Sequence, residues 1–216
     1  MTKKYFLFDI DGTLGLGISS IIPADTLYCL RRLVQEGHFI AIASGRLQHD
    51  TQTFADRYGI PAVVADGGNS LSLDGKILEM TGLPLDNCKA LLRDLTDRHY
   101  PWAVVTDNTI NRYTPYSDFP HDDPRNYMET VIRPVPIENL TAVYKIMYAR
   151  PQRLEDEPPT YGLPHLEYID HTYLIEPTDK SRGILRMLDL VGGRPEDAVV
   201  FGDGMNDISM FRKPFF

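Results

Sequence analysis

Four short apolar runs along the chain predict strands that are buried on both faces. Each run is rich in β-branched or aromatic residues and is followed closely by Gly, Asp or Ser; the runs are YFLF at 5–8, FIAIA at 39–43, AVVA at 62–65 and AVVF at 198–201. Continuous apolar runs of this length are typical of a parallel sheet, because both of its faces are covered. The two ends of the chain are therefore expected to share one sheet.

Helical periodicity separates these runs. Residues 23–37 carry leucine and valine at helical spacing, with Pro23 near the expected start and Gly37 at the expected stop. Residues 181–193 show the same spacing and also end in glycine. Strands that alternate with helices predict an α/β fold with a doubly wound, Rossmann-like parallel sheet. In such sheets, ligands bind at the carboxyl ends of the strands.

The middle of the chain has a different pattern. Residues 70–78 are typical of a hairpin that turns at an Asp-Gly pair. Residues 85–100 have the apolar stripe of an amphipathic helix. Residues 142–150 resemble a strand, and residues 165–176 suit one or two strands. This stretch has enough elements to form an α/β unit of its own.

We therefore expect two domains. The chain has 216 residues and is 43% hydrophobic, which is enough for two packed cores. A larger α/β domain is predicted at 1–80 and 173–216, and a smaller α/β domain at 81–172 is inserted into it. Domain boundaries of this kind are set by the ends of the neighbouring elements.

Two carboxylates directly after the first strand pose a physical problem. Asp9 and Asp11 are two residues apart, and alternate side chains of an extended chain face the same side. Two such charges at 4 Å repel by roughly 4 kcal/mol near a protein surface. A shared proton, a cation or a basic neighbour can offset this repulsion. The plainer alternative is a solvated turn, since Asp-Gly is a common turn pair.

The last predicted strand also ends in carboxylates. FGDGMND contains Asp203, between two glycines that allow close approach of a ligand, and Asp207, which could cap a helix that begins near Ile208. Oxygen ligands from several strand ends suit Mg²⁺, a hard cation that prefers carboxylates, carbonyls and water.

The second strand is followed by ASGR. Ser44 offers a hydroxyl, and the amides of Gly45 and Arg46 open the next helix, which makes a possible anion site. An ordinary turn between a strand and a helix accounts for the same residues.

A lysine near the start of the last predicted helix is less easily accounted for. A cation there is disfavoured by the helix dipole by about 0.3–1 kcal/mol. Thr178 or Asp179 can cap this helix, and Asp179 can also neutralise Lys180. Held toward the strand ends, Lys180 would counter a phosphate and the carboxylates together.

These segments resemble a known family. FDIDGTL, ASGR, the lysine of TDKSRG and GDGMND, in that order, are similar to the four motifs of the haloacid dehalogenase (HAD) superfamily. The insertion between the second and third motifs resembles the cap domain of Cof-type HAD phosphatases. The likeness covers nearly the whole chain. One departure is ADGGNSL, where relatives often have Asn-Gly-Ala, so that Asp66 adds an acid near the pocket.

The resemblance implies a role for each matching residue. Asp9 is expected to be the nucleophile that forms an aspartyl-phosphate, and Asp11 the general acid and base. The groups implied for the metal, Mg²⁺, are the Asp9 carboxylate, the Asp11 backbone carbonyl, Asp203 and Asp207. The groups implied for the phosphoryl oxygens are Ser44, Gly45, Lys180 and Asn206.

The expected function is hydrolysis of small phosphorylated metabolites, with sugar phosphates as the first candidates. A phosphomutase uses similar motifs and a similar cap, and a noncatalytic binding protein could share the fold. Four charged residues in one predicted pocket favour an enzyme over a scaffold.

Relatives continue after the fourth motif with a further strand and helix. We therefore expect an exposed edge where Phe211, Phe215 and Phe216 gather. Either the 216 residues are a fragment or a partner, such as a second copy in a homo-oligomer, covers that edge.

Bulk composition excludes some partners. The net charge of −8 argues against non-specific nucleic-acid binding, which needs a basic patch. The apolar runs have the length of strands, so neither a transmembrane helix nor membrane partners are expected. Cys29 and Cys88 offer neither a disulfide framework nor zinc spacing, and we expect a reduced, cytoplasmic location.

Overall fold

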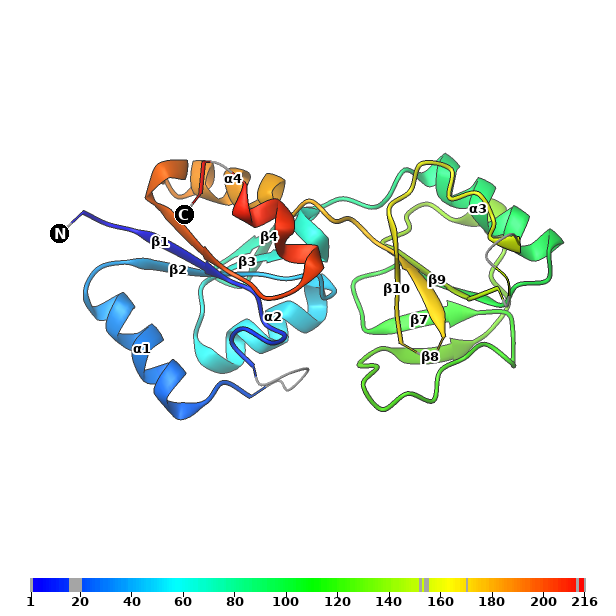
Figure 1. Ribbon diagram of the computed structural model, residues 1–216, viewed down its shortest axis with the longest axis horizontal. Coiled ribbons are helices and arrows are strands. Elements are labelled where there is room, and N and C mark those ends of the chain that lie inside the picture. Colours follow the sequence, from blue (N-terminus) through cyan, green and yellow to red (C-terminus); the bar gives the residue numbers. More distant parts are fainter. Residues whose placement is uncertain are drawn as a thin grey trace. The chain divides into compact units, whose positions relative to one another are not determined.

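The chain divides into two compact units (Figure 1). The computed structural model describes residues 2–15, 21–151, 153, 156–169, 171–212 and 214–215. Met1–Met80 and Pro177–Phe216 form one unit, called the core unit here. Thr81–Glu176 form the other, called the inserted unit.

The core unit is built on one six-stranded sheet, and all four apolar runs of the sequence are strands in it. Its strands, in spatial order, are β12 (Ala198–Phe201), β1 (Tyr5–Phe8), β2 (Phe39–Ala43), β3 (Ala62–Ala65), β4 (Ser70–Leu73) and β5 (Lys76–Met80). The first four are parallel, as predicted. β4 and β5 form the expected hairpin, which turns at Asp74 and Gly75 with positive φ at both residues.

Helices cover both faces of this sheet, which confirms the doubly wound fold. α1 (Ala24–Gln35) and α2 (Gln48–Tyr58) lie on one side of the strands, and α4 (Lys180–Leu190) lies on the other (Figure 1). Alternate residues of the strands supply two separate apolar cores. Phe8, Ile42 and Val63 pack on the side of α2, whereas Leu7, Ala41 and Val64 pack on the side of α4.

The inserted unit has a six-stranded sheet of its own. In spatial order it contains β10 (His165–Glu167), β11 (Thr172–Ile175), β9 (Lys145–Ala149), β6 (Trp102–Val105), β7 (Asn111–Thr114) and β8 (Glu129–Ile132). α3 (Leu85–Asp97) packs on one face of this sheet and buries Cys88, Leu92 and Leu95 against it (Figure 1). No strand was predicted from the sequence in the segments that form β6, β7 and β8.

The second boundary lies a few residues later than the sequence suggested. β11 pairs antiparallel with both β9 and β10, so its residues are held in the inserted unit. The inserted unit therefore ends at Glu176 rather than near residue 172.

The prediction of exposed aromatic side chains near the end of the chain is wrong for Phe215. Phe215 packs into the core on the side of α4. Phe211 is 55% exposed, and Phe216 lies outside the described residues. Within the described chain, no helix combines the length and the apolar character needed to cross a membrane.

Candidate active site

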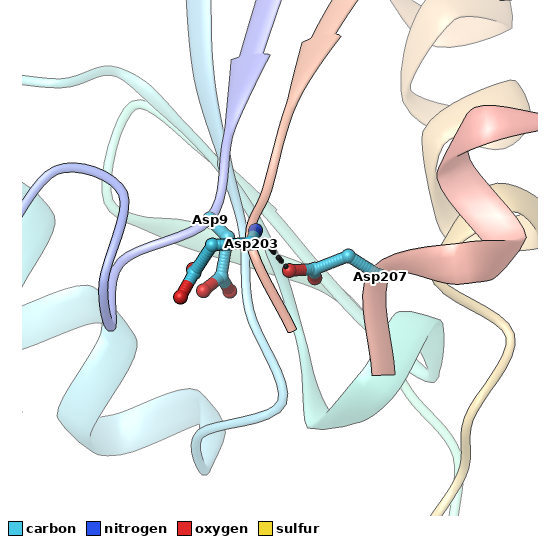
Figure 2. A group of neighbouring side chains, drawn as sticks. All are labelled: Asp9, Asp203 and Asp207. Atoms are coloured by element: carbon cyan, nitrogen blue, oxygen red, sulfur yellow. Dashed lines mark hydrogen bonds between the residues drawn. The ribbon is translucent and has the colours of Figure 1, made fainter. Parts of the chain in front are cut away.

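The carboxyl ends of β1 and β12 bring two acidic segments together. Phe8 is paired with Phe201 in register, and the amide of Asp9 donates to the carbonyl oxygen of Phe201 at 2.9 Å. Because the strands are parallel, the chain leaves both of them at the same edge of the sheet. Asp203 follows β12 at this edge, 194 positions after Asp9 in the sequence but next to it in space (Figure 2).

Three carboxylates form one compact group (Figure 2). Asp9, Asp203 and Asp207 each offer one oxygen, and these oxygens all lie within 4.8 Å of one another. Asp9 is 4% exposed and Asp207 is 0% exposed, whereas Asp203 is open to solvent. The group thus has a buried side and an accessible side, which suits a site that a ligand enters from solvent.

Lys180 neutralises part of this charge. Its Nζ donates to Oδ1 of Asp9 at 2.7 Å and also bonds Oδ1 of Asp207. Lys180 is fully buried and is the first residue of α4, which Asp179 caps by accepting from the amide of Arg182 at 3.3 Å. Of the two caps that the sequence allowed, the structure has Asp179.

The loop after β3 packs closely against the backbone at the start of α4. The loop after β3 has glycines at 67 and 68, and a methyl group on Gly68 would lie 2.3 Å from the carbonyl oxygen of Asp179. Gly68 also has a positive φ of 102°. Only glycine allows this contact, so the loop fixes where α4 begins and where its lysine points.

One lysine does not balance three carboxylates. Burial raises the pKa of the Asp9 carboxyl to about 6, and the nearby charges of Asp207 and Asp11 add to this rise, although Lys180 opposes it. The group therefore favours a further positive charge. Its donors are oxygens only, which are the ligands that Mg²⁺ prefers. The residues present therefore fit a magnesium ion.

Asp207 shapes the loop that carries Asp203. Its Oδ2 accepts from the amides of Asp203 and Gly204, both at 3.0 Å. The sequence suggested that Asp207 could cap a helix beginning near Ile208; the helix begins earlier than that, and Asp207 bonds the amide of its N-cap residue, Gly204. A 3-10 helix already begins at Met205, and Asp207 lies inside it and turns back onto the loop.

The turn after β1 also contacts Asp203. The hydroxyl of Thr13 donates to Oδ1 of Asp203 at 3.0 Å. Gly12 has a φ of 81°, and a methyl group there would lie 2.0 Å from Oδ2 of Asp203. The first and fourth motifs are thus fitted to each other, and Gly12 leaves room for the carboxylate.

Asp11 is held by an arginine that the sequence reasoning did not assign to the site. Nε of Arg46 donates to Oδ2 of Asp11 at 2.8 Å, and Nη2 donates to Oδ1 at 2.6 Å. From the sequence, only the amide of Arg46 was expected to contribute to the site. A signal for its side chain was present, because β1 and β2 are neighbouring parallel strands and Asp11 and Arg46 follow their ends.

The other residues that were predicted to bind the phosphoryl oxygens follow strand ends of the same sheet. Ser44 is buried after β2, and its Oγ accepts from the amide of Arg46 at 3.2 Å. Gly45 is half-buried in the same turn, and Asn206 lies between Asp203 and Asp207 in the sequence. The additional acid, Asp66, is buried with a φ of 48° and accepts from the hydroxyl of Ser70 at 2.6 Å.

Comparisons with known proteins match nearly the whole chain. A family model described as haloacid dehalogenase-like hydrolase matches residues 6–213. The chain is similar to the 5-amino-6-(5-phospho-D-ribitylamino)uracil phosphatase YwtE of Bacillus subtilis (strain 168), with 23% identity over 96% of this chain and 84% of that protein.

The chain is also similar to solved structures over nearly its whole length. A hypothetical protein from Geobacillus kaustophilus HTA426 aligns with a TM-score of 0.82 and 26% identity, over 97% of this chain and 83% of that one. A sugar phosphatase of HAD subclass IIB aligns with a TM-score of 0.76 and 25% identity, over 97% of this chain and 84% of that one.

Proposed function

Because the chain belongs to the haloacid dehalogenase-like hydrolases, we propose that it is a Mg²⁺-dependent phosphatase of small phosphorylated metabolites that works through an aspartyl-phosphate. The observation that carries the proposal is the group around Asp9. A buried carboxylate lies 2.7 Å from the ammonium of Lys180 and within 4.8 Å of oxygens of Asp203 and Asp207. Such an arrangement offers a nucleophile beside positive charge and a metal site, which are the elements that phosphoryl transfer needs.

In the first step, an oxygen of Asp9 attacks phosphorus and the bond from phosphorus to the ester oxygen breaks. Asp11 donates a proton to the departing oxygen, which leaves as an alcohol. Asp9 then carries the phosphoryl group as a mixed anhydride. We assign Lys180, Ser44, the Gly45 amide and Asn206 to the nonbridging oxygens, where donors stabilise the charge of the transition state.

In the second step, water attacks the phosphorus of the aspartyl-phosphate. Asp11, now a carboxylate, accepts a proton from this water. The bond from phosphorus to the Asp9 oxygen breaks, inorganic phosphate forms, and the carboxylate of Asp9 is restored. The proton that Asp11 takes from this water replaces the one that it gave to the alcohol, so the cycle closes.

Asp9, Asp203, Asp207 and the backbone carbonyl of Asp11 are the groups that we assign to Mg²⁺. When bound, the ion would supply positive charge that neutralises the phosphoryl oxygens and lets the carboxylates lie close together. The raised pKa of Asp9 supports this assignment: burial is its main cause, the charges of Asp207 and Asp11 add to it, and Lys180 does not offset them.

The relatives suggest which substrates to test first. One is named for a phosphoribityl ester and another is described as a sugar phosphatase, so both names contain a phosphate ester on a polyol or sugar. We therefore propose sugar and polyol phosphates as the substrate class. The reduced, cytoplasmic location inferred from the two cysteines and a homo-oligomeric state remain predictions.

The proposal is tested by Asp9→Asn, an almost isosteric change that removes the nucleophile. We expect kcat to fall at least about 10³-fold on a panel of sugar phosphates. Wild-type protein quenched in acid during turnover should carry phosphate on Asp9, as detected by mass spectrometry of peptides. The matched control is Asp25→Asn, which changes an exposed carboxylate in the first turn of α1.

The metal is tested separately by chelation. Activity should vanish in excess chelator and return with Mg²⁺, and Ca²⁺ should restore it poorly because it favours a larger, looser oxygen shell. An Asp9→Asn variant with more than a few percent of wild-type turnover would contradict the nucleophile. Full activity in chelator would contradict the metal.

A further inference from the structure

The side chain of Arg46 makes a two-pronged contact with Asp11. Its Nε and Nη2 each donate to a different oxygen of the same carboxylate, at 2.8 and 2.6 Å. A planar guanidinium that binds both oxygens fixes the plane and the direction of a carboxylate, which a single hydrogen bond does not do. The contact joins the ends of two strands across 35 residues of sequence.

Arg46 is much more firmly held than the group it binds. The side chain of Arg46 is 8% exposed, whereas that of Asp11 is 35% exposed. The backbone of Arg46 is bonded on both sides, because its amide donates to Ser44 Oγ at 3.2 Å and its carbonyl accepts from the amide of Asp66 at 2.9 Å. Asp50, in the first turn of α2, accepts from Nη1 at 2.9 Å.

A partly exposed aspartate in a turn needs such support if it transfers protons. A general acid must lie within hydrogen-bond reach of the atom that it protonates. The guanidinium occupies one acceptor site on each oxygen of Asp11, so another site on each oxygen is left for substrate or water. Arg46 can therefore orient Asp11 without blocking it.

We infer that Arg46 is a positioning residue, which acts on the reaction through Asp11 by holding its carboxylate toward the departing ester oxygen. This inference rests on the proposed phosphatase function and adds a residue to it. The alternative role for a buried cation at a strand end is direct contact with the phosphoryl group. The two roles differ in how the effect of a substitution depends on the leaving group.

The experiment compares two esters in wild type, Arg46→Gln and Arg46→Lys. One ester is p-nitrophenyl phosphate, whose leaving group departs readily as an anion. The other is glycerol 2-phosphate, whose alkoxide needs a proton as it leaves. The value of kcat/KM reports the steps up to release of the alcohol. If Arg46→Gln misplaces the carboxyl of Asp11, the loss of kcat/KM should therefore be at least about tenfold larger for glycerol 2-phosphate than for p-nitrophenyl phosphate. Arg46→Lys keeps the positive charge but cannot donate from two nitrogens to the two oxygens of Asp11, so it should show the same selective loss.

A double-mutant cycle with Asp11→Asn shows whether Arg46 acts through Asp11. The variant Asp11→Asn should retain some activity on p-nitrophenyl phosphate. If Arg46 works by orienting Asp11, adding Arg46→Gln to Asp11→Asn should lower kcat/KM on this ester by less than twofold. The matched control is Arg32→Gln, which removes an arginine that pairs with Glu36 at 2.8 Å on the surface of α1. It should leave the ratio of the two esters unchanged.

Several results would overturn the inference. An equal loss on both esters, or additive losses in the cycle, would indicate contact with the phosphoryl group or a general structural effect. Wild-type discrimination in Arg46→Lys would show that charge alone is sufficient. If the wild type hydrolyses neither these esters nor any sugar phosphate of the panel, the proposed function fails and this inference fails with it. Asp9-dependent hydrolysis of both esters with no selective loss in the Arg46 variants would reject the positioning role alone.

Discussion

Each of the two units contains a buried lysine that bonds a carboxylate. The two groups differ in the number of carboxylates around the lysine and in their place in the fold. In the inserted unit, Lys145 at the start of β9 bonds Glu176 just after β11, in an ion pair of one lysine and one carboxylate. In the core unit, Lys180 bonds Asp9 and Asp207, and Asp203 completes a group of three carboxylates. All of these side chains are buried except that of Asp203.

The difference separates a structural pair from a chemical site. In a buried pair of one lysine and one carboxylate the two charges balance, and such a pair is often replaceable by apolar residues without loss of stability. A group with more carboxylates than cations, at the ends of parallel strands, has an excess of negative charge that a metal ion can neutralise. Burial alone does not identify the site; the excess of carboxylates and their accessible side do.

The largest expected effect comes from removing the lysine of the unbalanced group. Lys180→Met should lower kcat/KM at least about 10³-fold, because it removes a cation assigned to the transferring phosphoryl group. This loss corresponds to about 4 kcal/mol of transition-state stabilisation. Steady-state kinetics on the substrate panel, with circular dichroism to confirm folding, measure it.

The control for Lys180→Met is Lys4→Met. Lys4 pairs with Asp197 at 2.8 Å in the same unit but is partly exposed. This variant should keep nearly full activity. Comparable losses in the two variants would remove the distinction between the site and an ordinary ion pair.

The balanced pair should instead matter for stability. Lys145→Met leaves Glu176 buried without its cation and should lower the free energy of unfolding by about 3–5 kcal/mol. The double variant Lys145→Met with Glu176→Leu removes both charges and should recover most of that loss. Urea unfolding measures both variants. A double variant as unstable as the single one would show that this pair does more than neutralise itself.

The unbalanced group should also make metal-free stability depend on pH. The pKa of Asp9 is raised from 3.8 to about 6 in the folded chain, mainly by burial. The folded state therefore holds this proton more tightly than the unfolded chain does. The contribution of Asp9 to the free energy of unfolding is full below about pH 4 and is lost as pH rises through about 6. A difference of one in pKa corresponds to about 1.4 kcal/mol, so the rise from 3.8 to about 6 corresponds to a loss of about 3 kcal/mol in the free energy of unfolding.

Urea unfolding in chelator between pH 4 and 7 measures this dependence. Other groups titrate in the same range, so the quantity to follow is the difference between wild type and Asp9→Asn, which has no proton to lose. Saturating Mg²⁺ should abolish the difference in slope, because a cation beside Asp9 favours its carboxylate. An equal slope in wild type and Asp9→Asn would contradict the raised pKa.

The sequence predicted the core unit well because its strands are buried on both faces. Continuous apolar runs such as those at 39–43 and 198–201 are too short for most helices and are typical of buried parallel strands, and polar residues after them mark the ligand-binding edge. β8 was missed for the opposite reason. It is a four-residue edge strand of mixed polarity, and only its parallel pairing with β7 defines it.

The site was predictable as a set of residues but not as a set of contacts. The strand ends placed Asp9 and Asp203 together, since the carboxyl ends of parallel strands lie at the same edge of the sheet. The fork of Arg46 on Asp11 depends on the rotamer of a long side chain, which spacing does not encode. Nor does spacing show that Asp207 turns back to bond the amides of Asp203 and Gly204.

The smallest expected effect concerns the fit between the first and fourth motifs. Gly12 and Gly75 both have positive φ, 81° and 74°, so alanine is strained at either position. A methyl group at Gly12 would also lie 2.0 Å from Oδ2 of Asp203, whereas none of the surrounding atoms comes within 4 Å of one at Gly75. Both variants should lose about 1–2 kcal/mol of stability from backbone strain. Only Gly12→Ala should displace Asp203, and it should weaken activation by Mg²⁺ about tenfold, as measured by titrating the metal in activity assays. Equal activation by Mg²⁺ in the two variants would show that Asp203 can move aside without cost to the metal site.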